Sequence, residues 1–168
     1  MTSFSSALRS IDLEDPESEI PASNIKQLLD RVSAIVDEHL DGLPELERTM
    51  RLDLGRVYLS YRYFEESDRE LTRALALARS LHDVPHADLA STMHQYGRLQ
   101  WNTARYRAAE ATYRETLDIW RAVHEGDSAE IAATMQHLAS SLREAGALQE
   151  AMTWYDEALA MRRRLLEP

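Results

Sequence analysis

The sequence predicts an all-α fold, a right-handed α-solenoid of antiparallel helix pairs. Apolar residues recur at intervals of three and four along most of the chain, and no stretch alternates with a period of two. Short segments with turn residues separate the helical stretches, which makes neighbouring helices antiparallel. The pattern also repeats every 42 residues, and a period of this size built from helix pairs is typical of solenoids.

The first 45 residues carry much of the negative charge. Residues 1–45 contain 10 acidic and three basic residues, whereas residues 46–168 are nearly balanced. Residues 1–20 are rich in serine and acidic residues, so we expect a disordered tail there. An amphipathic helix is predicted over 24–41, after a cap at Ser23 or Asn24, and Gly42 is a plausible left-handed residue at its end.

Six more helices follow from the same periodicity. Pro85, Gly126 and Gly146 mark breaks between them. The predicted helices are 45–61, 64–82, 87–103, 106–124, 128–144 and 147–166.

Small residues recur inside these helices at matched positions, namely Gly55, Gly97 and Ala139. A glycine costs up to about 1 kcal/mol against alanine within a helix. We therefore expect the second helix of each pair to cross closely at these points. Small residues recur on the second helices as the expected partners at these crossings, namely Ser67, Ala109 and Ala151. Bulky residues also recur there and are expected to fill the space between adjacent pairs, namely Leu71, Tyr113 and Tyr155.

These positions resemble the tetratricopeptide repeat family. The run Leu54-Gly55-x-x-Tyr58 is similar to the family's L-G-x-x-Y, and Ala74 and Ala158 match its later alanine. The 42-residue period is similar to the kinesin-light-chain type. The single lysine among 19 basic residues fits a GC-rich bacterial genome.

The resemblance implies a repeat domain over 21–168. Its predicted parts are an N-terminal helix over 24–43 and repeats over 44–85, 86–127 and 128–168. In this family the first helices of the repeats line a concave groove that takes extended peptides, so the resemblance implies an interaction adaptor or regulatory module.

Projecting the family's groove positions onto this chain places arginines beside a tryptophan. Guanidinium groups suit carboxylates, so we expect a peptide or protein partner, in particular an acidic one. The alternative is that these arginines pair with nearby acids on a solvated surface. The predicted groove residues are Arg56, Leu59, His94, Arg98, Trp101, Asn102, Gln136 and Arg143.

Composition argues against several other functions. The chain has 168 residues, no cysteine and a net charge of −10, which excludes disulfides and thiolate metal sites and disfavours binding to nucleic acid or anionic membranes. No apolar run is long enough to span a membrane and the acidic N-terminus does not resemble a signal peptide. We therefore expect a cytoplasmic protein.

We find no catalytic constellation, so we expect no enzyme, no cofactor and no metal. His82 and His86 have a spacing that can chelate a metal, but Pro85 lies between them in a predicted turn. The alternative function is a small helical enzyme or a small-molecule-binding protein with a pocket in the concave face, near His94, Trp101, His137 and Arg98.

Both ends of the chain suggest further contacts. The acidic residues of 12–19 could dock in the arginine stripe as an internal ligand. The last helix, 147–166, keeps apolar residues with no following helix to cover them, so a homodimer through this helix is a further hypothesis.

Overall fold

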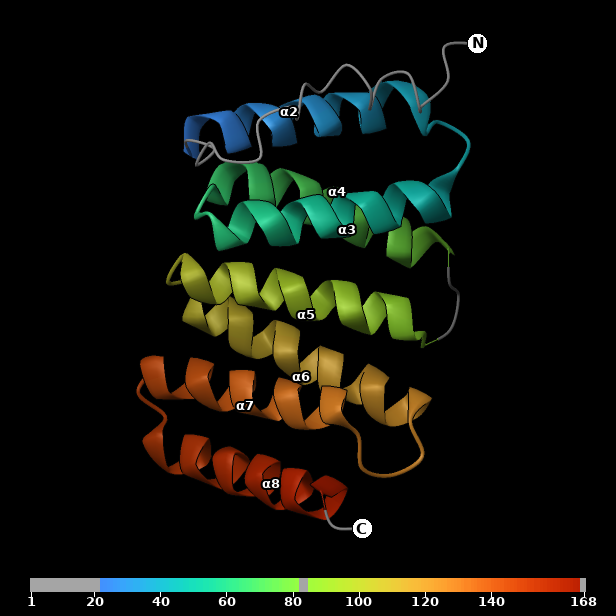
Figure 1. Ribbon diagram of the computed structural model, residues 1–168. Coiled ribbons are helices and arrows are strands. Elements are labelled where there is room, and N and C mark those ends of the chain that lie inside the picture. Colours follow the sequence, from blue (N-terminus) through green and yellow to red (C-terminus); the bar gives the residue numbers. More distant parts are fainter. Residues whose placement is uncertain (1–21, 82–84, 167–168) are drawn as a thin grey trace.

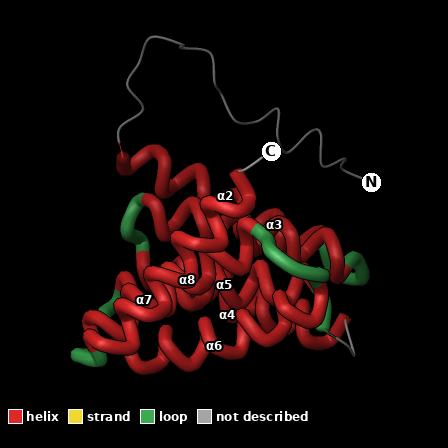
Figure 2. The backbone as a smooth tube through the Cα atoms, turned by 90° about the horizontal axis from the view of Figure 1, so that it is seen from below, coloured by secondary structure: helices red, strands yellow, loops and turns green. Residues whose placement is uncertain are grey.

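The computed structural model describes residues 22–81 and 85–166, and every regular element in these two ranges is a helix. The helices stack in chain order from α2 at one end to α8 at the other (Figure 1). Short loops join them (Figure 2). Their bounds are α2 Ala22–His39, α3 Pro44–Ser60, α4 Phe64–Leu81, α5 Ala87–Asn102, α6 Tyr106–Val123, α7 Ala129–Glu144 and α8 Leu148–Leu166.

The all-α repeat fold is confirmed. The helices after α2 lie within one or two residues of their predicted bounds. Helix α2 begins at Ala22 rather than after Ser23 or Asn24, and it ends at His39, before the left-handed Gly42 with φ 84°. The predicted tail and His82 lie outside the described residues, so the docking of the tail stays a prediction, as does the expectation that His82 and His86 are turn residues that bind no metal.

Each helix pair is closed by the same turn. The residues Arg62, Ala104 and Gly146, which are 42 apart, have φ of 63°, 57° and 88°. The next N–H in each turn donates to a carbonyl five residues back, which is the 6→1 bond of a Schellman motif. These bonds run from Tyr63 to Tyr58 (2.9 Å), from Arg105 to Gln100 (2.8 Å) and from Ala147 to Leu142 (2.9 Å).

The close helix crossing predicted at the two glycines is confirmed. A Cβ at Gly55 would lie 2.5 Å from Cγ of Leu71, and one at Gly97 would lie 2.8 Å from the ring of Tyr113. Ser67 Oγ also donates to the Gly55 carbonyl at 2.9 Å. The bulky side chains of the second helices therefore occupy the space that the glycines leave.

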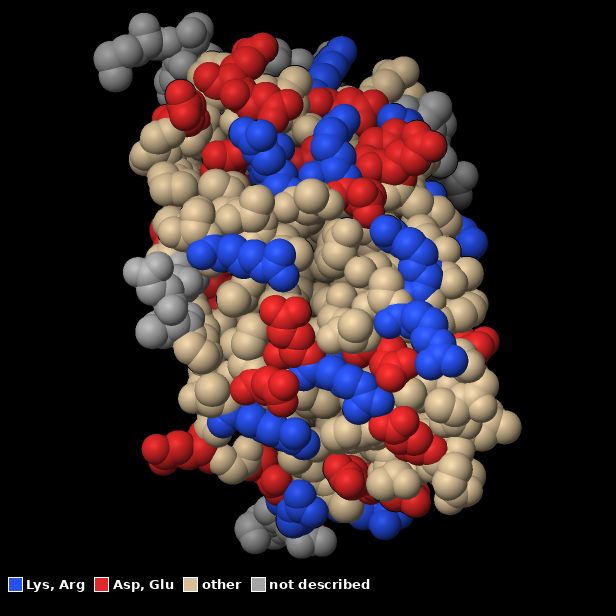
Figure 3. Space-filling model, turned by 180° about the vertical axis from the view of Figure 1, so that it is seen from behind, with Lys and Arg blue, Asp and Glu red and all other residues tan. Residues whose placement is uncertain are grey.

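Helix α2 is held to the next pair by an apolar cluster that includes Val36 and Tyr58 and also by polar contacts. Arg51 on α3 is 3% exposed and donates to Asp37 on α2 (2.6 Å), to Glu47 (2.7 Å) and to Glu70 on α4 (2.9 Å). The fully buried Glu70 also accepts from Ser33 Oγ on α2 at 2.7 Å. Charged side chains of both signs gather at this end of the molecule (Figure 3).

Candidate functional site

The predicted groove residues separate into three environments. Arg56 and Arg143 are exposed and form ion pairs with acids on their own helices, Asp53 (3.6 Å) and Glu144 (2.8 Å). This is the solvated-surface arrangement that the sequence left open. Leu59 is 5% exposed and packs in the core, so its side chain has little surface to offer a partner.

Four of the other predicted residues meet at one half-enclosed cavity of about 240 Å³ between α5 and α7. We call it the Arg98 cavity. Helix α6 supplies its inner wall through Tyr113, which fits because Gly97 on α5 leaves room for that ring. The residues lining the cavity are Arg98, Trp101, Asn102, Tyr113, Gln136, His137 and Ser140.

Arg98 brings a half-buried positive charge to this cavity. Its Nη1 donates to Gln95 Oε1 at 2.9 Å. No carboxylate of the described residues forms an ion pair with it, in contrast to Arg56 and Arg143. A guanidinium has five N–H donors and keeps its charge at any ordinary pH, so most of its donor capacity is free for another group.

Two uncharged donors in the cavity wall have no hydrogen-bond partner within the described part of the chain. They are Nε1 of Trp101 and the hydroxyl of Tyr113, and both atoms are buried. Burial raises the pKa of Tyr113 above its usual value, so the hydroxyl keeps its proton. Both groups are therefore donors that need an acceptor.

Two histidines pack against the Tyr113 ring. The rings of His137 and Tyr113 stack with centroids 5.6 Å apart, and His94 meets the other two edge-on at 5.6 Å from Tyr113 and 5.0 Å from His137. Burial lowers the pKa of His94 to about 3, with help from His137 and Arg98. Burial and Arg98 lower the pKa of His137 to about 4, so both rings are neutral at pH 7.

The tautomer of His94 follows from its neighbour. Nδ1 of His94 lies 3.0 Å from Oγ1 of Thr134, and that hydroxyl donates its only proton to the Glu130 carbonyl at 2.7 Å. The Thr134 oxygen must therefore accept, which places the proton of His94 on Nδ1. His94 thus supports the cavity from behind rather than lining it.

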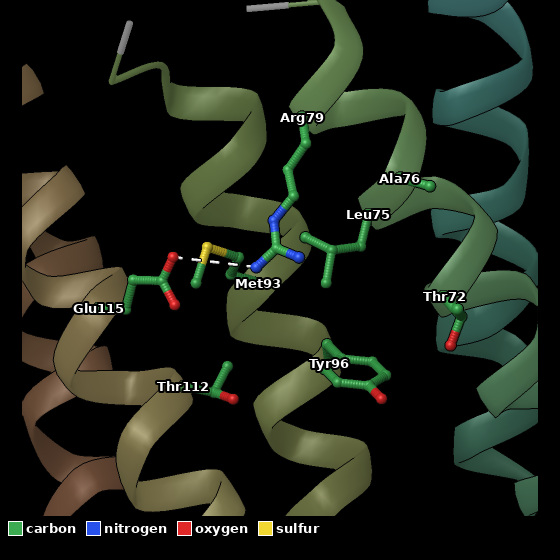
Figure 4. A pocket seen from close by; sticks show the side chains of 8 residues that line it. All are labelled: Thr72, Leu75, Ala76, Arg79, Met93, Tyr96, Thr112 and Glu115. Atoms are coloured by element: carbon green, nitrogen blue, oxygen red, sulfur yellow. Dashed lines mark ion pairs between the residues drawn. The ribbon is translucent and has the colours of Figure 1, made fainter. Parts of the chain in front are cut away.

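A second cavity, of about 300 Å³, lies between α4, α5 and α6. Its lining includes the buried Leu75 and Met93, and Arg79 and Glu115 form an ion pair of 3.9 Å beside it (Figure 4). This cavity was not predictable from the sequence, because its lining residues come from three helices and carry no recognisable motif.

The place of Tyr113 in the cavity wall was not predicted from the sequence. A packing residue was expected there, because Leu71 and Tyr155 occupy the matched positions. The hydroxyl of Tyr113 was the one sequence signal for more than packing, because the hydroxyl of a buried tyrosine normally has a hydrogen-bond partner.

The described residues contain no cluster of three or more His, Asp or Glu side chains that could hold a metal ion. In the same residues, no helix combines the length and the apolar character needed to cross a membrane.

Comparisons with known proteins agree with the geometry of the stack. A family model described as "Tetratricopeptide repeat" matches residues 45–121 and 101–164. The TPR domain of Arabidopsis FLU superposes with a TM-score of 0.66 and 25% identity, covering 72% of this chain and 98% of that chain. None of the curated proteins compared with the chain matches it.

Two further solved structures share the fold at lower identity. A protein from Podosopora anserina, described as a kinesin light chain with nearly identical TPR-like repeats, has a TM-score of 0.71 and 15% identity over 87% of this chain and 71% of that chain. BtubC (BKLC) from P. vanneervenii has a TM-score of 0.67 and 20% identity over 98% of this chain and 72% of that chain.

Proposed function

Since the chain belongs to the tetratricopeptide repeat family, we propose that it is a non-catalytic interaction module that binds an acidic segment of a partner protein. Repeats of this family generally mediate protein–protein interaction and are typically non-catalytic. In this proposal the segment lies across the first helices α3, α5 and α7.

The observation that carries the proposal is the Arg98 cavity. It places a half-buried guanidinium with no ion-pair partner among the described residues between two successive first helices. Arg56 on α3 and Arg143 on α7 extend the positive charge along the same set of helices, although each is paired with a neighbouring acid. These exposed ion pairs contribute little to the stability of the fold. The carboxylates of an acidic segment could therefore replace Asp53 and Glu144 as partners of the two arginines.

A peptide-display selection with the full chain tests this. We expect the selected peptides to be enriched in Asp and Glu, and the Arg56→Ala/Arg98→Ala variant to bind them at least about tenfold more weakly, because charge-assisted bonds contribute roughly 1.5–3 kcal/mol. Arg73→Ala/Arg107→Ala is the matched control, because these arginines are exposed on the second helices α4 and α6. Peptides without acidic enrichment, or an equal loss in the control, would contradict the proposal.

We also propose that two copies associate through α8. Leu159 is 48% exposed, whereas Leu75 and Leu117 at the matched positions are 9% and 2% exposed. In the earlier pairs the next first helix covers this face, so a second α8 would supply the missing cover.

Sedimentation at micromolar concentrations tests this association. We expect a dimer for the wild type and a monomer for Leu159→Glu, with Arg163→Glu as a control on the same helix. A monomeric wild type would refute the proposal.

A further inference from the structure

We propose that the Arg98 cavity binds one carboxylate group, with Trp101 Nε1 and the Tyr113 hydroxyl as neutral donors and Arg98 as the cation. If the carboxylate belongs to a Glu or Asp side chain of the bound segment, the inference rests on the proposed function. A free small carboxylic acid presents the same chemistry, and the experiment separates the two sources.

The first step is the hydrogen-bond balance of the cavity wall. Nε1 of Trp101 and the hydroxyl of Tyr113 are buried, and neither has a partner among the described residues. An unsatisfied buried donor is costly and most are satisfied in native proteins. The side chains that carry these two donors come from different helices and line the same cavity. Both donor atoms are themselves buried, so the two rings must shift toward the cavity for an acceptor bound there to satisfy both.

The second step is the charge of that acceptor. Among the described residues, Arg98 is the permanent cation that lines the cavity, and none of the lining residues in that part of the chain carries a carboxylate. The neighbouring His94 and His137 are neutral at pH 7, so they add no second positive charge beside Arg98. The hydroxyl of Tyr113 keeps its proton as well. A negatively charged acceptor therefore fits better than an amide or a carbonyl.

The third step is size and valence. The cavity of about 240 Å³ is smaller than the roughly 300–1,000 Å³ of sites for drug-sized ligands, so it fits a side-chain-sized group. A carboxylate has two oxygens that together accept about four hydrogen bonds, which matches two neutral donors and one guanidinium. A phosphate dianion would bring two negative charges to a cavity lined by one permanent cation.

NMR of the uniformly labelled full chain observes the site directly, because the chain has three tryptophans and hence three indole N–H signals. Trp101→Phe assigns the relevant signal. We expect acetate to shift this signal in a saturable way, with acetamide, its neutral isostere, and inorganic phosphate both at least about tenfold weaker. A shift from acetamide equal to that from acetate, a stronger response to phosphate, or no saturable shift with acetate would overturn the inference.

Tyr113→Phe removes only the hydroxyl from the wall. We expect acetate to bind about tenfold more weakly to this variant, as for the loss of one hydrogen bond to a charged group. The matched control is Tyr106→Phe, because Tyr106 is on the same helix and packs against Trp101 without lining the cavity. An unchanged affinity in Tyr113→Phe, or an equal loss in the control, would contradict the assignment.

The melting temperature of the free variant gives a second readout. Since the Tyr113 hydroxyl has no partner in the described structure, Tyr113→Phe should melt at the same temperature as the wild type or higher. A lower melting temperature would mean that the hydroxyl makes an internal hydrogen bond, and the proposal would be wrong.

A blocked amino acid and a selected acidic peptide identify the source of the carboxylate. If the source is a side chain, N-acetylglutamate N-methylamide binds at least as tightly as acetate, and an acidic peptide from the display selection competes with it. If acetate binds but no peptide does, the cavity is a site for a free carboxylic acid and the proposed function fails alone. If peptides bind through Arg56 and Arg143 without moving the Trp101 signal, this inference fails alone.

Discussion

The two buried histidines predict a specific acid sensitivity of the fold. His94 and His137 are neutral in the folded protein, with pKa values lowered to about 3 and about 4 from an ordinary 6.5. The unfolded chain binds protons at these residues as the pH falls below 6.5, whereas the folded protein does not. Their contribution to stability is therefore complete above pH 6.5 and is lost as the pH falls toward the folded pKa values.

The size of the loss follows from the same values. At pH 5 the ordinary pKa lies about 1.5 above the pH and both folded values lie below it, so each histidine lowers the free energy of unfolding by about 2 kcal/mol relative to pH 8. Together they cost about 4 kcal/mol, a large part of the roughly 5–15 kcal/mol that stabilises a typical domain. Below about pH 3 the loss levels off, because the folded protein then binds the same two protons.

Urea unfolding at pH 8, 6.5 and 5 measures this effect. The wild type should lose about 4 kcal/mol more than His94→Gln/His137→Gln between pH 8 and 5, because carboxylate titration is common to both proteins and cancels in the difference. His39→Gln, at an exposed position on α2, should behave as the wild type. Equal losses in the wild type and the double variant, or histidine NMR titrations with folded values near 6.5, would refute the reasoning.

Three further substitutions test the packing. Ala104→Gly should raise the free energy of unfolding by about 1 kcal/mol, since a left-handed alanine is strained. Glu70→Ala should lower it by about 3–5 kcal/mol, because it leaves the buried Arg51 with one partner fewer. Gly97→Ala should lower it by about 1–3 kcal/mol, because the new methyl group meets the Tyr113 ring. Urea unfolding checks all three, and a change of the opposite sign in any of them would contradict its stated cause.

The helices were predictable from the sequence because each depends on its own periodicity. The close crossing within a repeat was also predictable, because Gly55 and Gly97 recur at matched positions. The sequence placed Leu71 and Tyr113 between adjacent pairs, whereas they fill the space beside these glycines within their own pairs. The resemblance to kinesin-light-chain-type repeats is confirmed by the family match and the solved structures.

The state of the site was not predictable in the same way. Whether Arg98 lacks a counter-charge while Arg56 and Arg143 find one depends on rotamers and on neighbours across helices. The missing partner of the Tyr113 hydroxyl appears only when α5, α6 and α7 are placed together. Equally, Arg51 shares its charge among acids of three helices, which no spacing rule identifies.

The position of the Arg98 cavity has a mechanical consequence. Each helix pair is closed by its own Schellman turn, and successive pairs meet where a second helix packs on the next first helix. The Arg98 cavity spans one such joint, since α5 and α6 form one wall and α7 of the next pair forms the other. A group bound there would contact two successive pairs at once, so its binding would oppose their separation at this joint.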